Sequence, residues 1–252
     1  MSVSYHPAPW SLRGHAFVYL LAPTEYPDPT FIGGFGVLLL IRYFDAPCGP
    51  YDELLYSPGR FQTSSGPAYR ITKIYVSLMD SVINGRRNWG IPKELAVFHW
   101  DDQKGVVQIH VVLPNGISIF EITMKRHYWT KIPYIDWDFL ARRLPLVQPS
   151  IDENTNAVLP GNMLKSFMSI QASSMVVTME DCHTDERYFP KIENSGVGRI
   201  GINAERFEMI FRTPESIPVT NFKTICNANH GGWFWRFANK LFCKSVVREK
   251  VV

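Results

Sequence analysis

The sequence lacks the patterns that mark a membrane-spanning, secreted or disordered protein. Its longest nearly apolar run, residues 31–41, is well short of the ~18 residues that a membrane-spanning helix needs. The first residues contain no basic stretch followed by an apolar run, and the four cysteines are scattered without a CxxC pair. We therefore expect a cytoplasmic protein with reduced thiols. An apolar fraction of 46% over 252 residues predicts a folded chain with its own core.

Charge and metal- or nucleotide-binding motifs are also scarce. The chain has 26 Lys and Arg against 23 Asp and Glu, and a net charge of +3 is too small to indicate a nucleic-acid or membrane-surface partner. No Walker A loop, GxSxG or HExxH is present, and the His, Cys and acidic residues of 181–186 have no second cluster with ligand spacing. The GxGxxG match at 196–201 follows a polar segment and precedes a strand-like one, which favours a glycine-rich turn. We expect no metal, nucleotide or flavin.

Aromatic residues, by contrast, are plentiful. The 7 Trp, 11 Tyr and 16 Phe make up 13% of the chain, which is typical of a β-rich core or of a pocket for a bulky apolar ligand. Apolar residues alternate with period two over residues 71–79 and 106–113, and further strands are predicted at 117–123, 173–179 and 206–212. Pro114-Asn115-Gly116 predicts a hairpin turn. Residues 34–43 are almost all apolar and predict a strand covered on both faces.

Helices are predicted at only three places: Asp80–Asn88, Asp136–Arg143 and Asn229–Phe242. Residues Pro145–Gly161 are rich in Pro, Asn and Asp and predict a loop-like insertion. Neither side of this segment forms a complete unit by itself, so we expect a single domain over residues 1–252. The pattern predicts an α+β fold dominated by antiparallel strands.

The segment Tyr75–Ala96 carries the pattern with the clearest chemistry. Lys93 follows a Gly90-Ile91-Pro92 bend and lies near Trp89. In a desolvated pocket the pKa of such a lysine falls, and the neutral amine can attack a carbonyl to form a Schiff base. The same pattern also fits a surface lysine that begins a strand.

This segment resembles the acetoacetate decarboxylase superfamily, whose members carry a Gly-Arg-Glu-x-x-x-x-Pro-Lys-Lys-Leu stretch. Gly85-Arg86 and Pro92-Lys93 with Leu95 match it, and residues 7–21 and 49–61 resemble two further segments of the family. The resemblance implies a mostly antiparallel β-cone or barrel with peripheral helices, and a homo-oligomer built from dimers. It also implies that Lys93 is the nucleophile, Glu53 the pocket glutamate and Arg13 an active-site arginine.

The sequence departs from the family pattern at two positions. Glu94 replaces the second lysine, and on an extended segment we expect its side chain to face away from that of Lys93. Leu39 occupies the place of an acidic pocket residue, which predicts a more apolar pocket. We expect the substrate to contact Leu39, Tyr51, Arg86 and Trp89, which are the candidate substrate-binding residues around the catalytic set.

Three functions fit these observations. The first is a cofactor-independent enzyme for an apolar carbonyl substrate, catalysing cyclisation, aldol condensation and dehydration, or isomerisation in the biosynthesis of a polyketide- or terpenoid-like metabolite. The second is a Schiff-base decarboxylase of a β-keto acid that uses Lys93. The third is a non-catalytic binder of an apolar metabolite. The replaced lysine and the missing acid favour the first function over the second, and the retention of Lys93, Glu53 and Arg13 argues against the third.

Overall fold

The structure, a computed structural model, describes residues 4–136, 145–192 and 199–218. The chain divides into a unit of Met1–Ile217 and a second unit of Pro218–Val252, and almost all of the second lies outside the described residues. The prediction of one domain over the whole chain therefore stays a prediction. The predicted helices at 136–143 and 229–242 also fall outside the described residues, apart from Asp136, which ends a strand.

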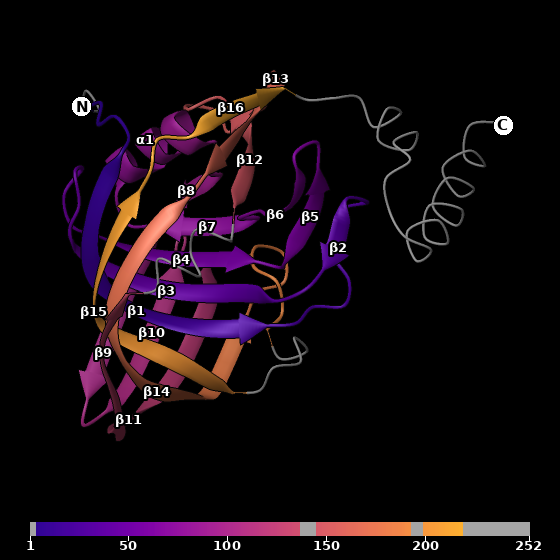
Figure 1. Cartoon of the computed structure of the whole chain (residues 1–252). Coiled ribbons are helices and arrows are strands. Elements are labelled where there is room, and N and C mark those ends of the chain that lie inside the picture. Colours follow the sequence, from indigo (N-terminus) through magenta and orange to yellow (C-terminus); the bar gives the residue numbers. More distant parts are fainter. Residues whose placement is uncertain (1–3, 137–144, 193–198, 219–252) are drawn as a thin grey trace, which may run out of the picture. The chain divides into compact units, whose positions relative to one another are not determined.

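The described part of the chain contains sixteen strands and one helix (Figure 1). In chain order these are β1 Trp10–Leu21, β2 Phe31–Gly33, β3 Gly36–Asp45, β4 Tyr51–Ser57, β5 Arg60–Thr63, β6 Gly66–Tyr69, β7 Lys73–Val76, α1 Met79–Trp89, β8 Lys93–Leu95, β9 Val97–Gln103, β10 Val106–Val112, β11 Ser118–Asp136, β12 Leu146–Ile151, β13 Val158–Ser166, β14 Met168–Thr184, β15 Ile200–Phe211 and β16 Glu215–Pro218. No helix among the described residues is long and apolar enough to cross a membrane.

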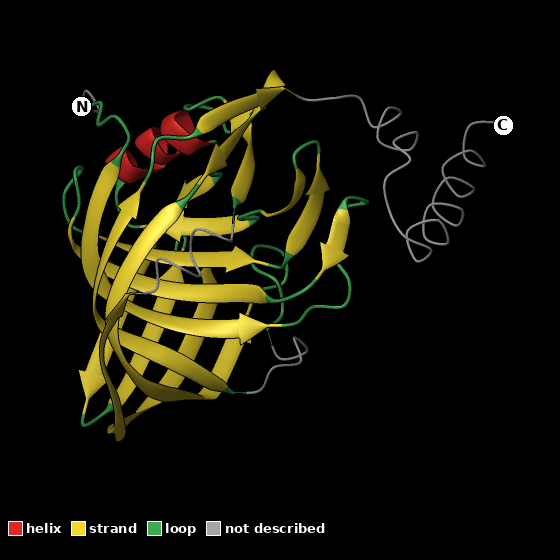
Figure 2. Cartoon of the chain, viewed as in Figure 1, coloured by secondary structure: helices red, strands yellow, loops and turns green. Residues whose placement is uncertain are grey.

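Ten strands form one sheet in the order β8-β7-β4-β3-β1-β15-β14-β11-β10-β9, and this sheet curls into a barrel-like form (Figure 2). Its neighbours are antiparallel except β7 and β8, which run parallel because α1 connects them as a crossover. A second sheet has the order β16-β13-β12-β6-β5-β2. The helix α1 contacts β7 and β8 of the first sheet and β12 and β13 of the second (Figure 1). The predicted antiparallel α+β architecture is confirmed.

The two faces of the large sheet support two separate cores. Because side chains alternate along a strand, Leu38 and Leu40 of β3 belong to one cluster, whereas Leu39 and Ile41 belong to the other. The first cluster joins β1, β3 and β4 to β10, β11 and β14, so it fills the inside of the curled sheet. The second joins β1, β3, β4 and β7 to α1 and β12. Strand β3 is therefore covered on both faces, as predicted.

Most of the predicted elements are confirmed, with one clear error. The helix α1 and the strands β3, β7, β10, β11, β14 and β15 lie where the sequence predicts them, and Gly116 turns the β10–β11 hairpin with a φ of 86°. The predicted loop at 145–161 is wrong, because it contains β12 and the beginning of β13. Its Asp and Asn residues are confined to the turn, where Asp152 Oδ1 accepts hydrogen bonds from the backbone N–H groups of Asn154 and Thr155.

Candidate active site

The bend between α1 and β8 places Lys93. Gly90 ends the helix in a left-handed conformation with a φ of 64°, and its N–H donates to the carbonyl of Arg86 at 2.9 Å. A side chain at Gly90 would also meet the carbonyl oxygen of Pro149 at 2.1 Å, so two constraints favour glycine here. Pro92 follows, and β8 begins at Lys93. This sharp reversal directs the Lys93 side chain back toward α1.

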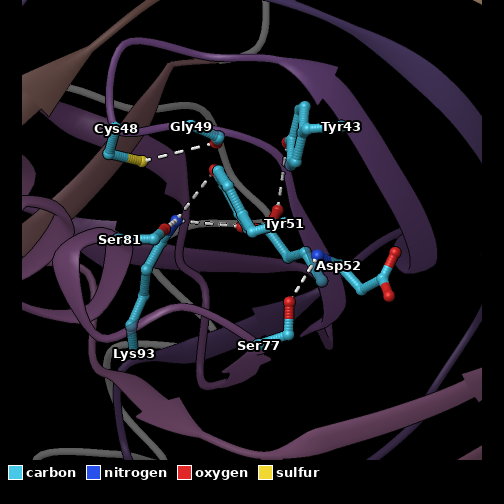
Figure 3. A network of polar contacts seen from close by, with 9 residues as sticks. Tyr43, Cys48, Gly49, Tyr51, Asp52, Ser77, Ser81 and Lys93 are labelled. Carbon is cyan, nitrogen blue, oxygen red and sulfur yellow. Dashed lines mark hydrogen bonds and ion pairs between the residues drawn. The ribbon is translucent and has the colours of Figure 1, made fainter.

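Strand β4 supplies the groups that meet this lysine. Tyr51 and Glu53 are two residues apart, so they lie on the same face of the sheet. The neighbouring strand β3 places Tyr43 opposite Tyr51 and Ile41 opposite Glu53. Tyr43, Tyr51 and Glu53 therefore lie on the face that α1 covers, and Figure 3 shows Tyr43 and Tyr51 near Lys93.

The ammonium group of Lys93 has an acceptor for each of its three N–H bonds. Lys93 Nζ donates to Glu53 Oε2 at 2.9 Å, to Ser81 Oγ at 3.0 Å and to the Tyr51 hydroxyl at 3.4 Å. The Tyr43 hydroxyl donates to the other carboxylate oxygen, Glu53 Oε1, at 3.2 Å. Lys93 and Glu53 are each only 4% exposed. The site is a buried, hydrogen-bonded ion pair with two phenol groups beside it (Figure 3).

The electrostatics of this site favour a charged lysine. Burial lowers the pKa of Lys93, but the Glu53 carboxylate and Tyr51 outweigh burial and raise that pKa above its ordinary value. Burial also raises the pKa of both Tyr43 and Tyr51, so both phenols are neutral. The pKa of the Cys48 thiol rises to about 11, mainly through burial. A lysine that forms a Schiff base needs a lowered pKa, and here the carboxylate 2.9 Å away raises it instead.

Two predicted site residues lie away from this ion pair. Arg13 is half-exposed and pairs with Asp45 at 3.7 Å and Glu208 at 3.4 Å, and it alternates with Trp10 and Leu12, which face the second cluster. The ring of Trp89 is buried against Trp10 and Phe211, with ring centroids 5.1 Å and 4.5 Å away. Its indole N–H donates to the carbonyl of Arg212. Arg13 is thus a surface residue and Trp89 a core residue.

The other two candidates border the site without touching its polar groups. Leu39 lies on the same sheet face as Glu53, but its partner on β4 is Leu55, two residues beyond Glu53. The Arg86 side chain binds backbone carbonyl groups. Its Nε donates to the carbonyl oxygen of Lys93 at 2.8 Å, and its Nη1 donates to the carbonyl oxygen of Asn154 at 3.3 Å. It holds β8 against α1 and the β12–β13 turn.

A cavity among the described residues lies beside α1 and β8. It has a volume of about 460 Å³ and is lined by α1, β8, the β10–β11 turn and the β12–β13 turn. Arg86 and Glu94 line it, whereas Lys93 and Glu53 do not. The expectation that Glu94 faces away from Lys93 is confirmed. Lys93 and Glu53 do lie together as expected, but they are enclosed by protein and do not line this cavity.

Two residues of the site were missed by the sequence analysis. Tyr43 comes from β3, and Ser81 lies one helical turn before Gly85 in α1. Period-two alternation from Ile41, with a hairpin to Tyr51, is a signal that points to Tyr43. The spacing of four between Ser81 and Gly85 is a weaker signal, because it identifies a helix face but not what lies against it.

Comparison with known proteins identifies the fold. No family model matches the sequence, and no curated protein matches it. Among solved structures, acetoacetate decarboxylase from Legionella pneumophila superposes with a TM-score of 0.61 at 14% identity, covering 88% of this chain and 91% of that one. The chain has the acetoacetate decarboxylase fold. The enduracididine biosynthesis enzyme MppR matches with a TM-score of 0.58 at 12% identity, covering 84% of this chain and 89% of its own. Identities this low establish the fold alone.

Proposed function

We propose that this chain is a cofactor-independent enzyme for an apolar carbonyl compound, in which Lys93 acts as a charged hydrogen-bond donor. The observation that carries the proposal is the Lys93–Glu53 pair. An ammonium and a carboxylate lie 2.9 Å apart, almost fully buried, at the bend that follows α1. A desolvated ion pair is costly for a protein to maintain. Such a pair within a fold that carries carbonyl chemistry in its solved relatives favours a catalytic role.

The proposed mechanism uses the acid and the base of this pair separately. The substrate carbonyl oxygen takes the place of a neutral acceptor of Lys93 Nζ, either Ser81 or Tyr51. The ammonium then stabilises the negative charge that develops on that oxygen. Glu53 removes a proton from the adjacent carbon, which leaves an enolate. When the enolate carbon attacks a second carbonyl, the new alkoxide takes a proton from Glu53, so that the carboxylate is regenerated.

Substrate entry requires the enclosed pair to become accessible. Because the pair is enclosed, a substrate bound beside it would be shielded from water. A fixed ammonium stabilises charge better in such a site than it does in water. The apolar side chains near Glu53 on the same sheet face, Leu39, Ile41 and Leu55, support an apolar substrate such as a polyketide- or terpenoid-like intermediate.

The solved relatives suggest the first substrates to test. Structures of MppR hold pyruvate and the condensation product of pyruvate with imidazole 4-carboxaldehyde. Acetoacetate decarboxylase has the same fold. Decarboxylation through a Schiff base is therefore the second candidate, favoured by the position of Lys93 directly after the Gly90-Ile91-Pro92 bend.

The experiment compares both reactions in one preparation treated with EDTA. Purified protein is incubated with acetoacetate, or with pyruvate and an aromatic aldehyde, and carbon dioxide and condensation products are measured with and without sodium borohydride. We expect condensation, dehydration or isomerisation products, no adduct on Lys93, and no dependence on a divalent ion. Lys93→Met should lower the rate by ~10²–10³, the usual cost of deleting one charge-stabilising donor. Lys73→Met on β7 is the matched control and should keep the rate.

Two results contradict the proposal. A reduced adduct on Lys93 together with carbon dioxide release from acetoacetate assigns the decarboxylase mechanism instead. Saturable binding of an apolar carbonyl compound without turnover, unchanged in Lys93→Met, assigns a non-catalytic binder.

A further inference from the structure

One turn of α1 forms a slot for the Lys93 side chain. Ser81 and Gly85 are four residues apart and therefore share one face of the helix. The Lys93 stem crosses the helix at Gly85, and its Nζ reaches Ser81 Oγ at 3.0 Å. The stem thus runs along one helical turn, from Gly85 toward Ser81, before the ammonium meets Glu53.

This path exists only because residue 85 has no side chain. A Cβ atom at Gly85 would lie 2.7 Å from Cδ and 2.8 Å from Cε of Lys93, closer than carbon atoms pack in proteins. The φ of Gly85 is helical, so nothing in the backbone conformation requires glycine. In an interior helical position glycine costs roughly 1 kcal/mol relative to alanine. The glycine is therefore explained by the lysine stem and not by the helix.

Neither backbone can easily yield to such a Cβ atom. Asn84 Nδ2 donates to the carbonyl of Ser4 at 2.8 Å and Asn88 Nδ2 to that of His6 at 2.7 Å, so α1 is tied to the N-terminal segment. The Lys93 carbonyl is held by Arg86 at 2.8 Å. The flexible lysine stem is the part that must move, and moving it takes Nζ away from Glu53.

We propose that Gly85 is a positioning residue that directs the Lys93 ammonium onto Glu53. A role of Gly85 in catalysis rests on the proposed function above, whereas its role in placing the Lys93 side chain does not. Gly85 thus positions the lysine without touching a substrate, and this role explains why the helix before the lysine carries a residue that weakens it.

The test is a double-mutant cycle between Gly85→Ala and Lys93→Ala, read by urea unfolding. With Lys93 present, the new Cβ atom displaces the stem, so Gly85→Ala should lower the urea midpoint or leave it unchanged. In the Lys93→Ala background the slot is empty, so the same substitution should raise the midpoint through better helix propensity. Equal shifts in the two backgrounds would show that Gly85 and Lys93 are not coupled and would overturn the proposal.

A second measurement follows the ammonium itself. Reductive methylation with labelled formaldehyde is quantified at Lys93 by mass spectrometry. We expect Lys93 to be protected in the wild type and in Ser81→Ala, which leaves the slot open, but to be modified at least several-fold faster in Gly85→Ala. Equal protection in all three proteins contradicts the inference. Neither readout requires turnover, so a failure to find a substrate counts against the proposed function and leaves the slot to be judged separately.

Discussion

Removing the charge of Glu53 without changing its size is the sharpest perturbation of this site. In Glu53→Gln, Lys93 keeps its burial but loses the carboxylate that raises its pKa. Burial alone lowers a lysine pKa, by up to 3–5 units for fully buried groups. We therefore expect the pKa of Lys93 in the variant to fall below its ordinary value of about 10.4. The substitution converts a charged donor into a neutral amine.

The direction of this change in the pKa of Lys93 can be measured from the pH dependence of the free energy of unfolding. In the wild type the folded-state pKa of Lys93 is raised, so its contribution to stability is fully present below about pH 10.4 and is lost as the pH rises through the folded-state pKa. In Glu53→Gln the folded state releases the proton first, and the unfolded state then binds one more proton. The free energy of unfolding of the variant should rise by up to about 1.4 kcal/mol per pH unit, between the lowered pKa and about pH 10.4.

Breaking a buried pair costs roughly 3–5 kcal/mol at neutral pH. The stability gap between the wild type and Glu53→Gln should therefore be large at pH 7 and narrow toward pH 9.5. Urea unfolding at half-unit intervals measures it. Asp52→Asn is the matched control, because the adjacent residue pairs with Arg42 at the same 2.9 Å on the opposite face of β4, where the Arg42 side chain is 48% exposed. It should cost less than about 1 kcal/mol, and its gap to the wild type should stay constant. A stability gap between the wild type and Glu53→Gln that stays constant with pH would refute the reasoning. So would a double variant, Glu53→Gln with Lys93→Met, whose free energy of unfolding rises with pH as steeply as that of Glu53→Gln alone.

Three further predictions follow from the same geometry. Tyr43→Phe removes the hydrogen bond to Glu53 Oε1 and should lower the free energy of unfolding by ~1.5–3 kcal/mol, the usual value for a bond to a charged group, whereas unchanged stability in urea would mean that the bond is not formed. Arg13→Ala should leave turnover within about two-fold, because its exposed ion pairs lie away from Lys93, and a loss of ~10² would return this arginine to the catalytic set. Light scattering at micromolar concentration should report an oligomer built from dimers, and a monomer would contradict that expectation.

The sequence by itself determined the local features of this site. Glycine at a helix end followed shortly by proline is a common helix-stop signal, so the end of α1 before Lys93 could be predicted from Gly90 and Pro92. The alternation of side chains along an extended segment likewise placed Glu94 on the side opposite to Lys93. These inferences succeeded because each depends on backbone geometry within a few residues.

Only the tertiary structure decided which groups meet and what charge they carry. Glu53 and Lys93 are 40 residues apart, and their contact depends on the register of β4 with β7 and of β7 with β8. The resemblance suggested the pair but not the Tyr43 and Ser81 partners, because those come from the folding of β3 and α1 against it. The charge state of Lys93 depends on a balance between burial and a carboxylate 2.9 Å away. That balance is a property of three-dimensional distance, which neither composition nor spacing along the chain contains.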